Sequence, residues 1–328
     1  MSGTTRNIEA VARAIREAKT VAVCSHINPD GDTLGCAAAM RLALLSLGKQ
    51  VSLFCDGKVP DRLMSFLPGA DGIRVPGKEE GPFDLMLAVD VSDEKRLGAC
   101  AALRSVSAHT AQVDHHPGNP LYMEENCVDG SAPAACVLIR ELLRALDVPL
   151  NRDLAICLYT GISTDTGNFA FASTTAECFE IMAELVAQGL PLAELNRILF
   201  RERSKPQVLL LGRALSHLTY YAGEQLAEIR LTQEDFEACH ALSEHADTLV
   251  NFVLDTAGTR MALMARETED GKIKFSLRAK EPDTISDIAQ RFGGGGHPQA
   301  SGITMDGSLD ETVAQVRNAM IEKLNGKQ

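Results

Sequence analysis

The sequence predicts an α/β protein in which a parallel-sheet domain is followed by a smaller α/β or α+β domain. In the first half of the chain, short apolar runs alternate with helical stretches, as in sheets whose parallel strands are buried on both faces. The last third is rich in β-branched and aromatic runs separated by turns and short helices. The length of 328 residues is enough for about two domains, each with its own core.

The expected elements of the first half follow one another in a regular order. Helical apolar spacing covers about residues 7–18 and 33–47. The pattern leaves the order of the strands in the sheet open. The expected strands are the β-rich runs at 20–25, 50–56, 83–90 and 109–114.

The second half begins with a helical segment from Thr174 to about Ser216, interrupted by glycine and proline, which indicates a connector between domains. We therefore expect a first domain over residues 1–190, a helical connector over 191–215 and a second domain over 216–328.

Within the second domain, strand-like runs precede a short helix near 284–291. The segment GGGGHPQASG at 293–302 is expected to be a loop. A final amphipathic helix is expected from about 309 to 324.

Composition excludes several classes of protein. No apolar run approaches the roughly 18 residues that suggest a membrane span. The N-terminus lacks the apolar core of a signal peptide, so we expect a cytoplasmic protein without a membrane partner. The nine cysteines are scattered among apolar neighbours without CxxC spacing, which is typical of reduced core thiols. The net charge of −12 opposes loading of a long nucleic acid, so a phosphate-bearing substrate should be short.

Acidic and imidazole side chains gather in four short clusters. Three clusters follow buried apolar runs, where a bare carboxylate is stable only if a cation or hydrogen bonds offset its desolvation. Because ligands of open α/β sheets bind beyond the carboxyl ends of the strands, we expect these three clusters in one crevice. The clusters are His26, Asp30 and Asp32 in SHINPDGD; Asp90 in LAVDVSD; Asp114, His115 and His116 in QVDHHP; and Asp165 in GISTDTGNF.

Asp165 differs from the others because it falls near the end of a probable helix. Leu154, Leu158 and Gly161 recur at helical spacing and place Asp165 on the same face. A carboxylate is disfavoured at a helix C-terminus, which indicates that a cation or another partner compensates it.

The chemistry of the clusters favours two hard metal ions. Imidazoles among several carboxylates, with no cysteine thiolate, suit Mn²⁺ or Mg²⁺ better than a structural zinc. Two such ions about 4 Å apart bind a phosphoryl oxygen and stabilise the charge that develops in an in-line displacement. The sequence therefore predicts hydrolysis of a phosphate ester.

Each cluster also has a simpler interpretation. Asp32 could cap the helix that follows it, and Asp90 could pair with Arg96. The His-His-Pro turn could be a surface loop. These alternatives do not explain why three clusters fall at strand ends, so the joint metal site is favoured.

Two features of the second domain indicate phosphate binding. The glycines at 293–296 lack the GxxxxGK[ST] spacing of a nucleotide P-loop, and they are either a flexible loop or a nest of backbone amides beside His297. Arg278, two residues after Ser276 on a strand-like run, could make a bidentate phosphate contact. Its simpler interpretation is an exposed strand arginine.

Taken together, the motifs resemble those of DHH-family phosphoesterases with an appended DHHA1 domain. They are spread over nearly the whole chain in the family's order. The length and the absence of fused domains resemble the stand-alone members that degrade very short RNA and dephosphorylate 3′-phosphoadenosine 5′-phosphate. The motifs are SHINPDGD, VDVSD, VDHHP, STDTGNF, SLRAK and GGGGHPQASG.

The resemblance implies a role for each site residue. It implies that Asp90 bridges two metals, that Asp114 orients a neighbouring imidazole, and that His116 contacts the scissile phosphate or assists proton transfer. The sequence departs from the family at Ser131-Ala132-Pro133, where Ser-Thr-Ala is usual. The implied ligands are His26, Asp30 and Asp90 for one metal and Asp32, Asp90, His115 and Asp165 for the other; the implied substrate contacts are Ser276, Arg278, Gly294, Gly295, Gly296 and His297.

We therefore expect a Mn²⁺-dependent phosphodiesterase with two ions, for which Mg²⁺ is an alternative. Its expected partners are short RNA oligonucleotides, dinucleotides and adenosine 3′,5′-bisphosphate. The sequence leaves open whether the chain forms a homodimer. One alternative is a phosphodiesterase that acts on linear pApA or pGpG, or on cyclic di-AMP. A manganese pyrophosphatase resembles the first domain alone. A nucleotide-binding regulator without hydrolysis is disfavoured because the ligand set is intact.

Overall fold

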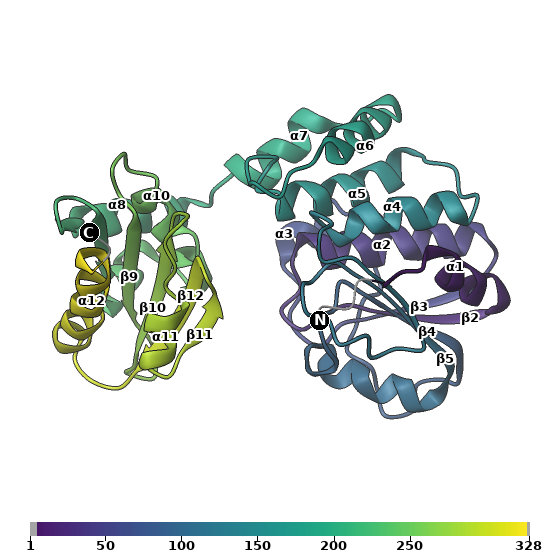
Figure 1. Ribbon diagram of the computed structural model, residues 1–328, viewed down its shortest axis with the longest axis horizontal. Helices are drawn as coiled ribbons and strands as arrows, with labels where there is room; N and C mark the ends of the chain where they lie inside the picture. Colours follow the sequence, from purple (N-terminus) through teal and green to yellow (C-terminus); the bar gives the residue numbers. More distant parts are fainter. Residues whose placement is uncertain (1–4, 327–328) are drawn as a thin grey trace. The chain divides into compact units, whose positions relative to one another are not determined.

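The computed structural model describes residues 5–326, and the chain divides into two compact units, residues 1–202 and 203–328. Each unit is built on its own six-stranded sheet. Figure 1 shows both sheets with helices packed against them. The predicted α/β class is confirmed, with a largely parallel sheet in the first unit.

The sheet of the first unit has the strand order β1-β6-β5-β4-β2-β3. Strands β2 to β6 pair in parallel, and the short strand β1 pairs antiparallel with β6. Parallel strands buried on both faces need apolar side chains in both directions, which explains the continuous buried apolar run Leu85–Val89 of β4. The strands are Thr5–Arg6 (β1), Thr20–Cys24 (β2), Gln50–Phe54 (β3), Phe83–Val89 (β4), Ser107–Asp114 (β5) and Glu125–Val128 (β6).

Helices cover both faces of this sheet. The helices α1, α2 and α4 share one core with the sheet, and the 3₁₀ segment η1 packs on the opposite face. The helical elements are Ile8–Glu17 (α1), Gly31–Ser46 (α2), Asp61–Met64 (α3), Glu94–Val106 (η1), Ala135–Ala145 (α4), Arg152–Asp165 (α5), Ala176–Ala187 (α6), Leu192–Asn196 (α7) and the π-helical turn Arg197–Arg201 (η2).

Helices α2 and α5 pack against each other unusually closely because glycines lie where they meet. A Cβ on Gly35 would come within 2.6 Å of the carbonyl oxygen of Cys157. A Cβ on Gly161 would lie 2.3 Å from both an Asp32 carboxylate oxygen and Cys136 Sγ. The close approach of α2 and α5 therefore depends on positions that lack a side chain.

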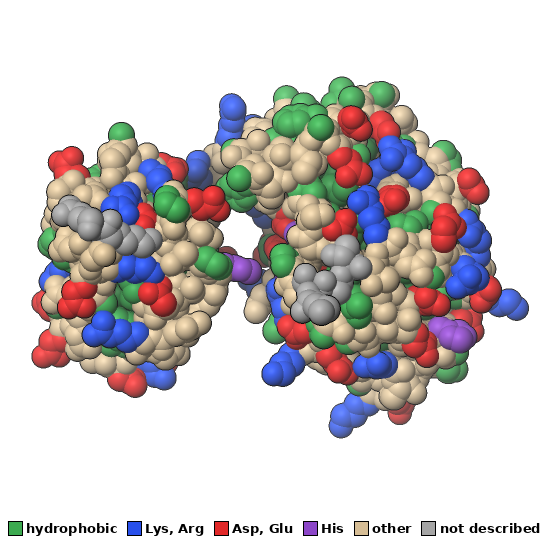
Figure 2. Space-filling model, viewed as in Figure 1, with side chains coloured by type: hydrophobic (Ala, Val, Ile, Leu, Met, Phe, Trp, Pro, Cys, Tyr) green, Lys and Arg blue, Asp and Glu red, His purple; other side chains and the backbone are tan. Residues whose placement is uncertain are grey.

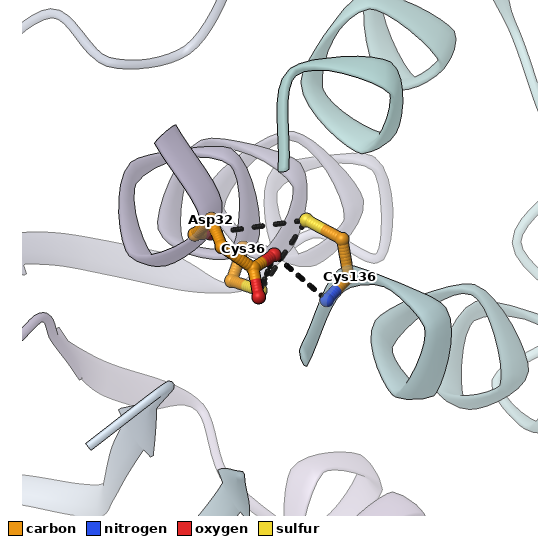
Figure 3. Close-up of side chains that lie close together, drawn as sticks. All are labelled: Asp32, Cys36 and Cys136. Carbon is orange, nitrogen blue, oxygen red and sulfur yellow. Dashed lines mark hydrogen bonds between the residues drawn. The ribbon is translucent and has the colours of Figure 1, made fainter. Parts of the chain in front are cut away.

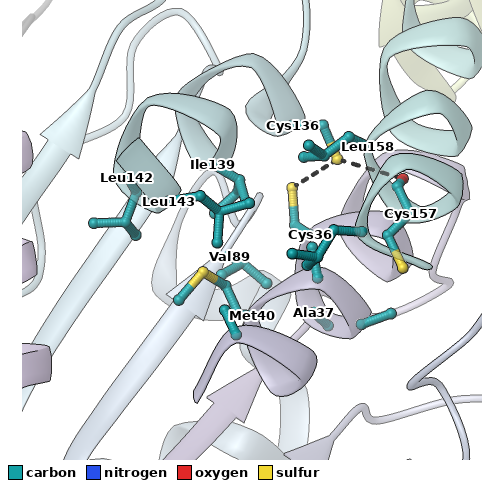
Figure 4. Packing of buried hydrophobic residues seen from close by; sticks show 14 of the residues in the cluster. Cys36, Ala37, Met40, Val89, Cys136, Ile139, Leu142, Leu143, Cys157 and Leu158 are labelled. Carbon is teal, nitrogen blue, oxygen red and sulfur yellow. Dashed lines mark hydrogen bonds between the residues drawn. The ribbon is translucent and has the colours of Figure 1, made fainter. Parts of the chain in front are cut away.

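The core between α2, α4 and α5 contains three of the cysteines (Figure 4). All nine cysteines are buried and form no disulfide, which confirms the prediction of core thiols. Burial raises the pKa of Cys136 and Cys157, so both stay protonated and behave as small apolar groups.

The predicted helices and strands of the first unit are confirmed to within two residues at each end. The strands β1 and β6 were missing from the prediction. Both are short, and Glu125–Val128 carries two polar residues among four, so neither gives a clear apolar alternation.

The sheet of the second unit has the strand order β11-β12-β10-β9-β8-β7. Strands β8 and β9 pair in parallel, and the remaining neighbours are antiparallel. The strands are Thr219–Tyr221 (β7), Leu226–Leu231 (β8), Met261–Glu267 (β9), Ile273–Ala279 (β10), Gly295–His297 (β11) and Ala300–Met305 (β12).

One apolar core lies on each face of the second sheet. Helices α11 and α12 contribute to one core, and helices α8, α9 and α10 contribute to the other. No helix within residues 5–326 is both long enough and apolar enough to cross a membrane. The helical elements are Lys205–Ser216 (α8), Gln233–Cys239 (α9), Ser243–Ala246 (η3), Leu249–Leu254 (α10), Ser286–Arg291 (α11) and Leu309–Asn325 (α12).

The prediction of a loop at 293–302 was wrong for most of this segment. The residues Gly295–His297 form the edge strand β11, which pairs antiparallel with β12. The glycines permit this pairing because a Cβ on Gly294 would lie 2.1 Å from the carbonyl oxygen of Gly302. The glycine run therefore allows two strands to approach closely, a use of glycine that composition alone does not distinguish from flexibility.

Candidate metal and phosphoester site

Three of the four acidic clusters meet at one edge of the first sheet. Strands β5, β4 and β2 are adjacent and parallel, so their carboxyl ends lie together. His26 follows β2, Asp90 directly follows β4, and Asp114 is the last residue of β5. The topology therefore brings these three clusters to the same edge of the sheet, the position where ligands of open α/β sheets bind.

Asp90 lies at the centre of the cluster, and its two carboxylate oxygens face different neighbours. Oδ2 lies 3.6 Å from Nε2 of His26, which in turn lies 3.6 Å from Oδ2 of Asp30. Oδ1 lies 3.4 Å from Nε2 of His115 and 3.6 Å from Nδ1 of His116. The carboxylate is thus shared between two groups of potential ligands, His26 with Asp30 on one side and His115 with His116 on the other.

The backbone of Asp90 has a φ of 57°, a left-handed conformation that aspartate adopts more readily than most residues. Its amide hydrogen-bonds the carbonyl of Val113 at 2.8 Å, which ties the turn after β4 to the end of β5. Strained backbone is often found at functional sites, where surrounding contacts hold it in place.

A third group of potential ligands includes the helical carboxylate. Nε2 of His115 lies 3.2 Å from Oδ2 of Asp165 and 3.8 Å from Oδ2 of Asp32. Asp165 is the last residue of α5, as the helical spacing predicted. The close packing of α5 on α2 brings its C-terminal carboxylate next to Asp32.

Backbone carbonyls orient the two imidazoles. Nδ1 of His26 lies 2.7 Å from the carbonyl oxygen of Ile27, and Nδ1 of His115 lies 3.1 Å from that of Ala132. In both residues Nε2 faces the carboxylates. An imidazole whose Nδ1 donates to a carbonyl can bind a metal through Nε2 once the ring is neutral. In the segment Ser131-Ala132-Pro133, the group that contacts His115 is thus the backbone carbonyl of Ala132 and not a side chain.

The Asp32 carboxylate is held by the N-terminus of α4. Its Oδ2 accepts a hydrogen bond from the amide of Ala135 at 2.5 Å, and its Oδ1 accepts one from the amide of Cys136 at 3.0 Å. Figure 3 shows this carboxylate beside the side chains of Cys36 and Cys136. Free amides at a helix N-terminus stabilise negative charge, so α4 fixes the position of a fully buried carboxylate.

The simpler interpretations of these residues fare differently. Asp30, not Asp32, caps α2, because its Oδ1 accepts from the amides of Asp32 and Thr33. Within residues 5–326, Arg96 makes no ion pair with Asp90; its Nη2 lies 3.0 Å from Nδ1 of His26. Helix capping therefore accounts for Asp30, and the amides of α4 account for Asp32. Neither explains Asp90, whose Oδ1 accepts no hydrogen bond within the described part of the chain.

The charged side chains of the cluster strongly shift one another's pKa values. Burial raises the pKa of Asp32 well above its usual range, and the charges of Asp90 and Asp165 raise it further. Burial also raises the pKa of Asp90, although His26 opposes the shift. Burial lowers the pKa of His115, but the surrounding carboxylates, Asp165 first, outweigh it and raise the pKa to about 10. The cluster is thus an excess of negative charge that attracts cations.

The residues present fit divalent metal ions. Oδ1 of Asp90 is buried and accepts no hydrogen bond within the described part of the chain. A buried carboxylate oxygen without a partner is costly unless a cation binds it. The carboxylates are hard donors that suit Mn²⁺ or Mg²⁺, and the imidazoles beside them add nitrogen donors. The groups that could hold an ion are His26, Asp30 and Asp90; Asp90, His115 and His116; and Asp32, His115 and Asp165.

His116 is oriented by Asp114. Its Nδ1 lies 2.8 Å from Oδ1 of Asp114, and its amide donates to Oδ2 at 3.2 Å. Burial raises the pKa of Asp114, but hydrogen bonds from His116 and Asn119 outweigh it and hold the pKa below its usual value. Asp114 therefore stays ionised and fixes the His116 ring.

Three of the predicted substrate contacts of the second unit, all with side chains, lie on one face of its sheet. Arg278 pairs across β12 with Ala300, which pairs with His297 on β11. Ser276 pairs with Gly302, which pairs with Gly295. Opposed residues point to the same face, so Ser276, Arg278 and His297 share it.

Arg278 is well placed to bind an anion. Its Nη1 donates to the carbonyl of Leu277 at 2.9 Å, and within residues 5–326 no carboxylate lies within ion-pair distance of it. Burial lowers the pKa of Arg278, although the charge of Asp247 opposes the shift. A half-buried guanidinium without a carboxylate partner is a good ligand for phosphate.

Sequence reasoning missed the groups that support the cluster. These are the amides of Ala135 and Cys136, the carbonyl of Ala132, and the side chain of Asn119. The main-chain groups belong to Ala and Cys residues whose side chains carry no sign of a site. Among these supporting groups, Asn119 is the one with a polar side chain close in sequence to a predicted site residue, three positions after His116.

Comparison with known proteins agrees with this geometry. The model of the DHH family N-terminal domain matches residues 20–162, and that of the DHHA1 domain matches residues 241–326. The chain is 32% identical to the bifunctional oligoribonuclease and PAP phosphatase NrnA of Thermus thermophilus, covering 92% of this chain and 89% of that protein. It is 26% identical to NrnA of Bacillus subtilis, covering 89% and 91%.

Among solved structures, the fold resembles that of an exopolyphosphatase-related protein from Bacteroides fragilis. The TM-score is 0.90 with 25% sequence identity, and the match covers 97% of this chain and 96% of that one. The likeness extends over both units. Together with the strand-end cluster, these matches show that the chain belongs to the DHH family, that it carries a DHHA1 domain, and that it is a hydrolytic phosphoesterase.

Proposed function

We propose that this protein uses two divalent metal ions, Mn²⁺ in the first instance, to hydrolyse the phosphodiesters of very short RNA and to remove the 3′-phosphate of adenosine 3′,5′-bisphosphate. The observation that carries the proposal is the position of Asp90, whose two oxygens face two separate groups of ligands. Shared carboxylates of this kind are typical of sites in which two ions lie about 4 Å apart.

The proposed ligands divide between the two ions. His26, Asp30 and Asp90 would hold one ion, and the other would be held by Asp32, Asp90, His115 and Asp165. When bound, the ions supply Lewis acidity, which activates water and neutralises the charge that develops on the phosphoryl oxygens. Asp32 needs no movement to take part, because the amides of α4 already fix its carboxylate.

The protein's own residues orient the substrate and move a proton. Release of a nucleoside 5′-monophosphate from RNA requires water to attack phosphorus while the bond to the ribose 3′-oxygen breaks. Removal of a 3′-phosphate breaks the same type of bond. His116, held by Asp114, would give a proton to the departing 3′-oxygen in both reactions. One leaving group thus accounts for both activities.

Surface charge supports a short substrate. Figure 2 shows acidic and basic side chains interspersed on the face in view, with no continuous basic surface over either unit. The net charge of −12 opposes the binding of a long polyanion. The relatives named as bifunctional oligoribonuclease and PAP phosphatase support short RNA and a nucleotide bisphosphate as substrates.

A substrate panel tests the proposed function. Short RNAs of graded length, short DNAs, pApA, pGpG, cyclic di-AMP, adenosine 3′,5′-bisphosphate and pyrophosphate are each incubated with Mn²⁺ or Mg²⁺, and the products are separated by chromatography. We expect nucleoside 5′-monophosphates from the shortest RNAs and AMP from the bisphosphate, both faster with Mn²⁺. Hydrolysis confined to pyrophosphate or to cyclic di-AMP would contradict the proposal, as would nucleotide binding without hydrolysis.

We further propose that the second unit binds substrate phosphate through Arg278, assisted by Ser276, His297 and the glycines of β11. Replacing Arg278 with alanine is expected to lower kcat/KM for a dinucleotide by roughly tenfold or more, chiefly through KM, because a charge-assisted hydrogen bond contributes about 1.5–3 kcal/mol.

The matched control for Arg278 is Lys274→Ala, which removes an exposed cation from the same face of β10. We expect this variant to keep wild-type KM. Steady-state kinetics with a dinucleotide measure both variants. Equal losses in the two would indicate that general positive charge, and not Arg278, binds the substrate.

A further inference from the structure

A chain of amide side chains is hydrogen-bonded to Asp114 of the DHH motif. Nδ2 of Asn119 donates to Oδ2 of Asp114 at 2.6 Å and to Oε1 of Gln112 at 3.0 Å. Nε2 of Gln112 donates to Oδ1 of Asn126 at 2.5 Å and to Oδ1 of Asn119 at 3.2 Å. Asn119 is 4% exposed and both Gln112 and Asp114 are fully buried, whereas Asn126 at the end of the chain of amides is half-buried.

The orientation of the Asn119 amide is fixed by its surroundings. Its Oδ1 accepts a hydrogen bond from the amide of Leu121 at 2.8 Å, so the oxygen must face the backbone and the nitrogen must face Asp114. Rotation of the amide by 180° would place two donors together at Leu121 and two acceptors together at Asp114. The geometry therefore permits one arrangement only.

Asp114 in turn uses its two oxygens for different partners. Oδ1 accepts from the ring of His116, while Oδ2 accepts from Asn119 and from the amide of His116. The strong hydrogen bond from Asn119 prevents rotation of the carboxylate. Within residues 5–326, Nε2 of His116 has no hydrogen-bond partner, so the fixed ring presents a free nitrogen.

From this geometry we propose that Asn119 is a positioning residue for the phosphoesterase reaction: it holds Asp114 in the one orientation in which His116 can give a proton to the departing oxygen. This inference rests on the proposed function of His116. Loss of Asn119 leaves Asp114 free to rotate, and the His116 ring is then aligned only part of the time. The expected consequence is a slower proton transfer with little change in substrate binding.

Kinetics of Asn119→Ala on two substrates test the proposal. With the dinucleotide pApA, we expect kcat to fall by roughly 10- to 100-fold, as for other residues that orient active-site groups, with KM nearly unchanged. With the 4-nitrophenyl ester of thymidine 5′-monophosphate, we expect kcat to fall by less than about threefold. The reason is that 4-nitrophenolate is a weak base and departs without a proton, whereas a ribose 3′-alkoxide needs one.

The control is Tyr122→Phe. The Tyr122 hydroxyl donates to the carbonyl of Val91, a carbonyl that Asn119 also contacts, and it does not donate a hydrogen bond to Asp114. We expect near wild-type kcat on both substrates. An Asn119→Ala effect that matches Tyr122→Phe, or that is equally large on both substrates, would overturn the proposal.

A double-mutant cycle provides a second readout. If Asn119 acts through Asp114, then Asn119→Ala should lower kcat no further in the background of Asp114→Asn. Additive losses would show that Asn119 acts elsewhere. Asn119→Ser is measured alongside Asn119→Ala. Thermal melting and bound manganese check that each variant folds and binds metal, and the proposal fails if neither Asn119 variant folds. If the wild-type protein does not cleave pApA, the proposed function fails instead.

Discussion

Replacement of Asp90 with alanine is expected to abolish hydrolysis, with kcat/KM for a dinucleotide falling by roughly a thousandfold or more, because the ions together supply several kcal/mol of charge stabilisation. The loss should exceed that of any other single ligand, since Asp90 faces both groups. Bound manganese, measured by elemental analysis after gel filtration, should fall below that of the wild type.

The matched control for Asp90 is a second carboxylate of the same turn. Asp93 lies three residues further along and accepts hydrogen bonds from the amides of Lys95 and Arg96. Asp93→Asn keeps the helix cap while removing the same charge as Asp90→Asn. We expect wild-type metal content for Asp93→Asn and strong loss for Asp90→Asn. Full activity of Asp90→Ala with saturating Mn²⁺ would contradict the shared-ligand site.

Replacement of Gly161 with alanine is expected to be the most damaging change outside the proposed ligands. The new Cβ would lie 2.3 Å from a carboxylate oxygen of Asp32 and 2.3 Å from Sγ of Cys136. The Asp32 carboxylate cannot move away without losing its hydrogen bonds to the amides of α4. We expect a stability loss of about 1–3 kcal/mol from overpacking and weaker Mn²⁺ binding by roughly 10- to 100-fold.

The control for Gly161 is Gly212→Ala. Gly212 is an exposed residue inside helix α8, and a Cβ there would meet nothing within 4 Å. Because alanine favours a helix more than glycine does, the free energy of unfolding of this variant should rise by about 0.5–1 kcal/mol. Denaturant unfolding and manganese titration measure both variants. A Gly161→Ala protein as stable as the wild type, with unchanged manganese affinity, would show that α2 and α5 can separate without harm.

The candidate cluster was predictable because its residues follow apolar runs. Such runs are long enough to identify strands, and parallel strands end at the same edge, so His26, Asp90 and Asp114 had to lie together. Asp165 was predictable because Leu154 and Leu158 set the phase of its helix. In both cases a local pattern was enough to give the direction of a side chain.

The supporting contacts were not predictable because they depend on tertiary packing. Nothing local to Ala135 or Cys136 indicates that their amides hold Asp32, more than 100 residues away in sequence. The orientation of Asn119 depends on Gln112 and Leu121 together. The glycine run was assigned to a loop because flexibility and close strand pairing have the same composition.

The most direct test of the two-metal site is a manganese titration of the metal-free protein. The protein is stripped with a chelator, and bound Mn²⁺ and cleavage of pApA are measured as the metal is added back. We predict no cleavage without metal and full activity when about two Mn²⁺ are bound per chain, with AMP as the product. Cleavage by the stripped protein, or binding of manganese without any cleavage, would contradict the account.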